Sequence, residues 1–178
     1  MGIGDLAYDN APIQASQFES DVRIAEQLDK IYFERGGGGN SFESYTAAWY
    51  FGVRHTNLDC WKRGKKGIII TMGDELLNPY LPARRLSKIT GDTLQDDVET
   101  ESLYKIASEK FDIYHLAVNN PATSYAWYKD EINNTYSKYL DKKHFLTVGL
   151  NNIASTIVNI VTNAKDEEVS ATNTEISW

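Results

Sequence analysis

The sequence predicts an α/β fold with a largely parallel central sheet, because strand-like and helix-like segments alternate through most of its 178 residues. Residues 67–73 (Gly-Ile-Ile-Ile-Thr-Met-Gly) form an apolar run typical of a central parallel strand buried on both faces. Residues 112–118 and 144–148 are the second and third predicted parallel strands. Hydrophobic residues make up 42% of the chain, which is enough for the core of one globular domain.

The amino-terminal third is predicted to hold a hairpin and two helices. Residues 2–8 and 12–16 read as short strands on either side of a turn, with Pro12 opening the second strand. Residues 18–32 predict an amphipathic helix whose apolar face contains Phe18, Val22, Ala25, Leu28 and Tyr32. Residues 41–55 predict the next helix, and Asn40 and Glu43 fit a capping box at its start.

Four further helices are expected in the second half of the chain. They cover residues 83–89, about 96–110, 123–140 and 152–164, and the second of them is expected to turn Leu103, Ile106 and Ala107 inward. Residues 1–164 are therefore expected to form one domain, and residues 165–178 a polar, loose tail from which Ile176 and Trp178 could dock.

Charge and composition exclude several classes of function. A net charge of −7 argues against a nucleic-acid or anionic-membrane surface, and the one dense basic cluster lies at residues 62–66. Cys60 is the only cysteine, so no internal disulfide or thiolate zinc site can form. No signal peptide or membrane span is evident, which predicts a cytoplasmic protein. His115 is expected to be a satisfied core or interface histidine. No complete catalytic triad or phosphate-binding loop is present, so an enzyme is the least favoured class.

The residues that could carry chemistry follow a glycine loop and the 67–73 strand. Four glycines at 36–39 precede Asn40 and Ser41, and Asp74 and Glu75 follow the strand at its carboxyl end, where open α/β sheets bind ligands. Each residue also has a structural interpretation. Asn40 and Glu43 fit helix capping, and Asp5, Asp9, Asp74 and Glu75 fit turns.

Taken in order, four short motifs resemble a bacterial and phage-type branch of the von Willebrand factor A (VWA) family. They are Gly4-Asp5 ending a strand, the Asp9-Asn10-Ala11-Pro12 turn, the glycines to Asn40 followed by Glu43, and Gly73-Asp74-Glu75 ending a strand. The resemblance covers roughly residues 2–163. It implies a Rossmann-like three-layer sandwich with a mainly parallel central sheet.

VWA domains usually hold a divalent cation at the carboxyl edge of the sheet. The resemblance implies Mg²⁺ or another divalent cation near Asn40, Ser41 and Asp74, with Glu43, Glu75 and Asp5 as further candidates at the binding edge. The site is expected to be incomplete. The family's Asp-x-Ser-x-Ser motif is absent, glycine or Asn40 replaces the usual Thr, and Asp74 is shifted by about one residue.

The family's central first strand, which carries that motif, is expected upstream of Met1, between the strands at 2–8 and 68–72. Its absence would leave two interior strand edges open. The chain is then a fragment, takes the strand from another polypeptide, or closes its sheet in another order.

Two classes of function remain. The first is a VWA-like module that binds a protein partner, assisted by a divalent cation. The second is a structural or assembly protein of a phage, virion-associated, that uses the scaffold without metal.

Overall fold

Three parallel strands form the main sheet of the computed structural model, which describes residues 1–34 and 39–173, with side chains of the last helix placed through residue 164. They are β4 (Gly67–Gly73), β8 (Phe111–Val118) and β9 (Phe145–Val148), in the order β4-β8-β9. Each agrees with its prediction to within a residue. The prediction of a central position for residues 67–73 is wrong, because β8 is central and β4 is an edge strand of this sheet.

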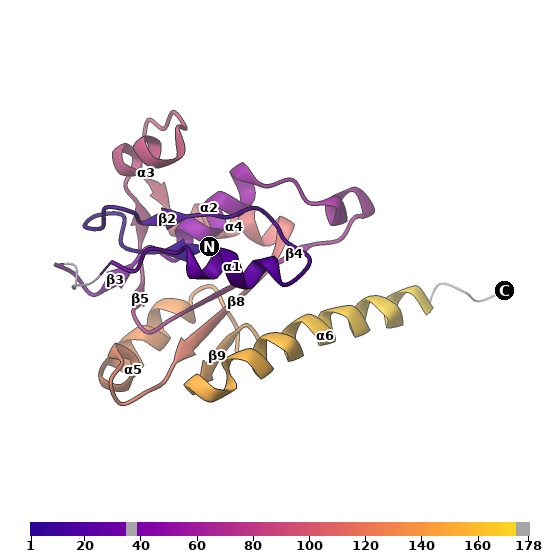
Figure 1. Cartoon of the computed structure of the whole chain (residues 1–178). Coiled ribbons are helices and arrows are strands. Elements are labelled where there is room, and N and C mark those ends of the chain that lie inside the picture. Colours follow the sequence, from indigo (N-terminus) through magenta and orange to yellow (C-terminus); the bar gives the residue numbers. More distant parts are fainter. Residues whose placement is uncertain (35–38, 174–178) are drawn as a thin grey trace.

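Helices cover both faces of the sheet (Figure 1). On one face, α2 (Thr46–His55) and α4 (Thr100–Lys110) pack against Phe111 and Ile113 of β8 in the larger core. On the other, α6 (Ile153–Asn173) packs Ile160 against Leu116 in a smaller core. Odd and even residues of β8 thus serve opposite faces, as the two-residue period of a strand requires.

Three two-stranded pairs surround the sheet. β1 (Gly2–Ile3) and β2 (Ile13–Gln14) form the predicted hairpin with much shorter strands, and Gly4 N–H extends it by bonding Pro12 O at 2.9 Å. β3 (Phe42–Glu43) pairs in parallel with β5 (Leu76–Leu77). β6 (Tyr80–Leu81) pairs antiparallel with β7 (Val98–Glu99). The remaining short elements are η1 (Asp59–Arg63), α3 (Ala83–Thr90), close to its predicted range, and η2 (Leu150–Asn152).

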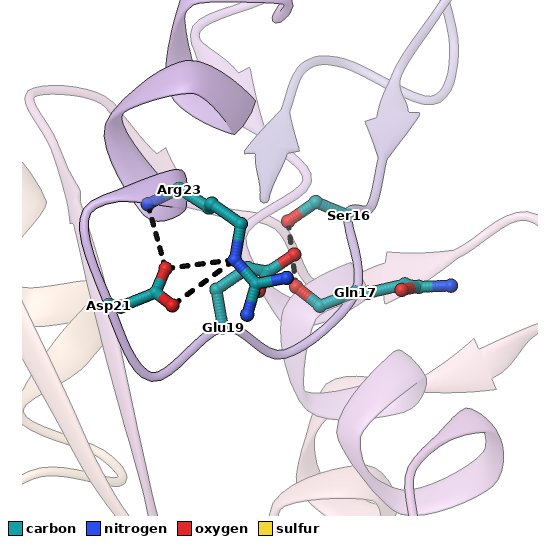
Figure 2. Close-up of polar contacts among 5 residues, drawn as sticks. All are labelled: Ser16, Gln17, Glu19, Asp21 and Arg23. Carbon is teal, nitrogen blue, oxygen red and sulfur yellow. Dashed lines mark hydrogen bonds and ion pairs between the residues drawn. The ribbon is translucent and has the colours of Figure 1, made fainter.

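The predicted 18–32 helix is shorter and more exposed than expected. It forms only α1 (Arg23–Asp29), and none of its residues is buried. Phe18 is 76% exposed and Val22 77% exposed, because no described element covers this apolar face. Local polar contacts begin the helix instead: Asp21 accepts hydrogen bonds from Arg23 N–H at 3.0 Å and from Arg23 Nε at 2.9 Å (Figure 2).

The capping box at the start of the second helix is wrong. Phe42 and Glu43 belong to β3, and α2 begins five residues after the expected start at 41 because the backbone first pairs with β5 and turns through Tyr45. Within α2, Trp49 and Tyr50 are buried. In α4, Leu103 and Ala107 are buried as expected, whereas Ile106 is exposed.

The last two helices also differ from prediction in length. α5 (Ser124–Tyr136) is shorter at both ends, whereas α6 continues to Asn173, beyond the expected start of the loose tail. α6 extends past the body of the molecule towards the carboxyl terminus (Figure 1). Ile176 and Trp178 lie outside the described residues. Within the described ranges, no helix has the length and apolarity needed to cross a bilayer.

Candidate functional site

A cavity of about 450 Å³ lies at the carboxyl end of β4, between that strand, the β1–β2 hairpin and β3. Its lining contains five of the six predicted site residues, namely Asp5, Asn40, Glu43, Asp74 and Glu75. Ser41 is not among the described lining residues. Its carbonyl accepts a hydrogen bond from Leu76 N–H at 3.3 Å and so helps to join β3 to β5.

The β1–β2 turn holds two carboxylates next to each other. Asp9 Oδ2 accepts a hydrogen bond from Asp5 N–H at 2.8 Å, and Asp5 Oδ1 accepts one from Ala7 N–H at 2.7 Å. A Cβ at position 4 would collide with the Asp9 carboxylate, so glycine allows that carboxylate to approach the Asp5 N–H. Asp5 is 6% exposed, yet its Oδ2 has no hydrogen-bond partner among the described residues. Asp5 Oδ1 therefore fills the predicted turn role, whereas Asp5 Oδ2 has no partner among the described residues.

Glu43 reaches the cavity from β3, beside the carboxylates of the hairpin. Burial, followed by the charges of Asp9, Asp5, Glu75 and Asp74 in that order, raises the pKa of Glu43 to about 7. Its Oε2 is buried and has no hydrogen-bond partner among the described residues. The charged form of Glu43 is thus unfavourable, and a bound proton or another cation would stabilise this side chain.

Asp74 and Glu75 connect the end of β4 to the start of α5. Asp74 Oδ2 accepts a hydrogen bond from Ser124 N–H at 2.8 Å, and Glu75 Oε1 accepts one from Ser124 Oγ at 2.5 Å. The Tyr45 hydroxyl accepts the N–H groups of Asp74 and Glu75 at 3.2 and 3.4 Å. Because the first N–H groups of a helix lack partners within it, Asp74 stabilises α5 as a carboxylate at a helix amino terminus. Burial raises the pKa of Glu75.

Asn40 forms a local turn, with Oδ1 accepting a hydrogen bond from Phe42 N–H at 2.9 Å. This bond uses one of the two lone pairs of the side-chain carbonyl, the oxygen that a cation would need. Most of the glycine run before it, residues 36–38, lies outside the described residues.

An aromatic cluster lies behind the cavity. The His115 ring stacks on Tyr136 at 4.1 Å between centroids and meets Tyr45 edge-on at 5.0 Å. Burial lowers the pKa of His115 to about 3, so the ring is neutral. His115 Nδ1 lies 2.9 Å from Thr71 Oγ1. The residue is fully buried, as the sequence predicted, but its Nε2 atom has no hydrogen-bond partner among the described residues.

The oxygen donors suit a hard divalent cation in type but not in placement. Carboxylate oxygens are the ligands that Mg²⁺ prefers, and the unsatisfied oxygens of Asp5 and Glu43 would gain from a cation. Within the ranges that the structure describes, however, no three or more His, Cys, Asp or Glu side chains are grouped to hold a metal ion.

Sequence reasoning did not single out Tyr45 or Glu34 as cavity residues, and it favoured a turn role over a ligand role for Asp9. Glu34 also lines the cavity, and its carboxylate accepts the N–H of Asn10 at 2.9 Å. The Asp-x-Ala-Pro turn was a usable signal for Asp9, whereas nothing local distinguishes Glu34.

Comparisons with models of protein families, with curated proteins and with solved structures found no match to this chain.

Proposed function

We propose that the chain is a protein-interaction module that accepts an extended segment of a partner along the open edge of β4. The observation that carries the proposal is the strand itself. β4 is seven residues long and apolar, and among the described strands it pairs only with β8. Edge strands of folded proteins usually carry a charge, a proline or a bulge that prevents further pairing, and β4 has no charged residue or proline.

The exposure of β4 supports this role. Met72 is 48% exposed, and the three isoleucines before it are only partly buried. An added strand would use the free backbone groups of the edge and cover these side chains, which is the general mode of strand addition. The cavity at the end of the edge supplies polar groups to fix the partner's position.

A divalent cation such as Mg²⁺ would assist this binding. The motifs that resemble VWA domains assign it to the edge formed by Asn40, Ser41 and Asp74, where it would accept a carboxylate from the partner. A cation there would also offset the mutual repulsion that raises the pKa of Glu43.

A structural or assembly role without metal is the second candidate. It is favoured by the hydrogen bonds that tie Asp74 and Glu75 to Ser124 and Asn40 to Phe42, because these bonds give the polar residues a purely structural purpose.

Photo-crosslinking tests the interaction directly. A photoreactive amino acid at Met72, in cells that express the chain, should give a discrete crosslinked adduct with a polypeptide. The matched control is Ile106 on α4, which is 50% exposed and distant from the β4 edge in the fold. Equal labelling from positions 72 and 106, or none from either, would contradict the proposal.

Calorimetry tests the cation. Titration of Mg²⁺ or Mn²⁺ into the wild-type chain should release or absorb heat, and the signal should be lost in Asp74→Ala and weakened in Asn40→Ala. If both cations give no heat signal and no shift in melting temperature, the metal-free role becomes the better account.

A further inference from the structure

Acidic and aromatic side chains share the walls of the cavity at the end of β4. Six of its described lining residues are carboxylic acids, namely Asp5, Asp9, Glu34, Glu43, Asp74 and Glu75. Four of the described lining residues are aromatic, and none of them is Lys, Arg or His. We propose that this cavity receives the guanidinium group of an arginine carried by the partner segment. The proposal rests on the open β4 edge of the proposed function and names the chemistry that the partner supplies.

Two of the six carboxylates have an oxygen that no described residue satisfies. Asp5 is 6% exposed, and both its Oδ2 and Glu43 Oε2 are buried without a hydrogen-bond partner among the described residues. The other four carboxylates accept hydrogen bonds from within the chain. A buried carboxylate oxygen without a partner costs free energy, and a charge-assisted hydrogen bond from a cationic donor offsets that cost. Asp5 and Glu43 are therefore the side chains that a cationic donor would bind.

The aromatic walls favour an organic cation over a hydrated metal ion. Phe42 and Tyr45 line the cavity on either side of Glu43 in the sequence. A guanidinium is planar, stacks on aromatic rings and donates five N–H groups in a fixed fork that matches carboxylate oxygens. Mg²⁺ keeps several of its waters and gains little from such rings. The cavity volume of about 450 Å³ also lies in the range of sites that hold organic ligands.

The last residues of β4 connect the open edge to the cavity. Met72 and Gly73 line the cavity, and β4 ends at Gly73. Directly paired residues of neighbouring strands point their side chains to the same face of a sheet. A Cβ at Gly73 would collide with the Tyr45 hydroxyl, so this is the face on which Tyr45 lies. A partner residue paired with Gly73 would therefore direct its side chain to the Tyr45 side, where the cavity is.

This placement needs no paired strand beyond Gly73. After Gly73 the chain turns, and the N–H groups of Asp74 and Glu75 bond the Tyr45 hydroxyl at 3.2 and 3.4 Å. The β1–β2 hairpin and β3 form the other wall of the cavity. The partner's backbone ends or turns away at Gly73, and only the long side chain of its arginine enters. The expected sequence feature of the partner is thus an arginine near one end of an extended segment.

A blocked amino acid tests the cavity in solution. In calorimetry with the full chain in EDTA, N-acetyl-arginine methylamide should bind, and its neutral isostere N-acetyl-citrulline methylamide should bind at least about tenfold more weakly. Asp5→Asn and Glu43→Gln should each weaken arginine binding about fivefold or more, because each neutralises one unsatisfied carboxylate. Asp59→Asn and Glu101→Gln are the matched controls. They make the same charge changes at exposed sites outside the cavity and should not alter binding.

Melting temperatures show whether the two cavity variants are folded. Each substitution removes a charge whose oxygen has no partner among the described residues, so both variants should melt at or above the temperature of the wild type. The contrast between arginine and citrulline uses the wild-type chain alone, so it tests the cavity even if a variant fails to fold.

A competition experiment identifies the source of the guanidinium. In cell extract, N-acetyl-arginine methylamide at ten times its dissociation constant should reduce the Met72 photo-crosslink by about fivefold or more. The citrulline derivative at the same concentration should leave the adduct unchanged. An adduct that the arginine derivative does not reduce overturns the partner as the source and makes a free guanidinium compound the ligand of the cavity.

The outcomes separate this inference from the proposed function. If arginine does not bind, or binds no better than citrulline, the inference is overturned, and a Met72 adduct would then leave the proposed function intact. Arginine binding without any Met72 adduct contradicts the proposed function, and with it the partner as the source of the arginine. Equal losses in the cavity and control variants would show only a general attraction to an acidic protein, which overturns the site.

Discussion

At the scale of single residues, Glu43 has the most unusual environment in the candidate site. Its carboxylate is half-buried, and the negative charges of four other acidic side chains add to the effect of burial in raising its pKa. Its sequence context suggested a helix cap, because Asn40 and Glu43 have capping-box spacing. The local pattern could not reveal that β3 pairs with a segment more than 30 residues away.

Glu43 should make the fold less stable as the pH rises. Its pKa in the folded protein is about 7 against an ordinary value of 4.5, so its contribution to stability is full below pH 4.5 and is lost as the pH rises to 7. After allowance for solvent screening, the loss should be about 1–2 kcal/mol. Urea unfolding at pH 5 and pH 8 should show this loss in the wild type and not in Glu43→Gln.

Glu101→Gln is the matched control for that measurement. Glu101 is exposed, and its hydrogen bond with Lys105 lowers its pKa, so this variant should keep the pH dependence of the wild type between pH 5 and 8. The same pH slope in Glu43→Gln and wild type would show that Glu43 is not the titrating group.

At the scale of elements, the carboxyl end of β4 and the amino end of α5 form one unit. Asp74 Oδ2 accepts the Ser124 N–H and supplies a negative charge at the positive end of the helix dipole. Asp74→Ala should therefore reduce the free energy of unfolding by about 1–2 kcal/mol, and Asp74→Asn, which keeps an acceptor, by less. Chemical denaturation measures both, and Asp59→Ala, which removes only a surface ion pair with Lys62, should change stability by less than about 0.5 kcal/mol.

An element is predicted well when contacts that are local in the sequence determine it, and poorly when contacts with distant segments do. β4, β8 and β9 were predicted almost to the residue, because runs such as Ile68-Ile69-Ile70 favour a buried strand locally. The starts of α2 and α4 were misplaced, because the residues before them form β3 and β7 with distant partners. For α1, periodicity identified an apolar face but carried no information on whether any surface covers it.

The candidate site was predictable to a similar extent. Residues at the end of a parallel strand, such as Asp74 and Glu75, gather at a known edge of the sheet, so their grouping could be expected. The edge position of β4 could not be predicted from its own residues, because an apolar sequence is the same whether the strand has one neighbouring strand or two.

At the scale of the whole molecule, stability should be uneven. The region around α1 is held by exposed polar contacts, such as Tyr32 N–H to Gln14 Oε1 at 2.8 Å and Asn10 N–H to Glu34 at 2.9 Å, and α1 buries none of its residues. A seven-residue helix without a buried face is marginal in water. Hydrogen exchange measured by mass spectrometry should show α1 amides exchanging at least about a hundredfold faster than those of β8.

The amides of α2 provide an internal reference for that experiment. α2 is also short but buries Trp49 and Tyr50, so it should be protected nearly as well as β8. Equal protection of α1 and α2 would mean that α1 is stabilised by packing that its exposure does not indicate.

The short length of β9 limits how far any assembly through β4 can grow. β9 has four residues, follows Lys142 and Lys143 closely, and pairs only with β8 among the described strands. Once a partner segment occupies the edge of β4, the other edge of the main sheet is this short strand with lysines beside it, which is a poor template for another strand. Pairing along the main sheet would therefore stop after one added segment, and the apolar edge that could have seeded a fibre would be covered by it.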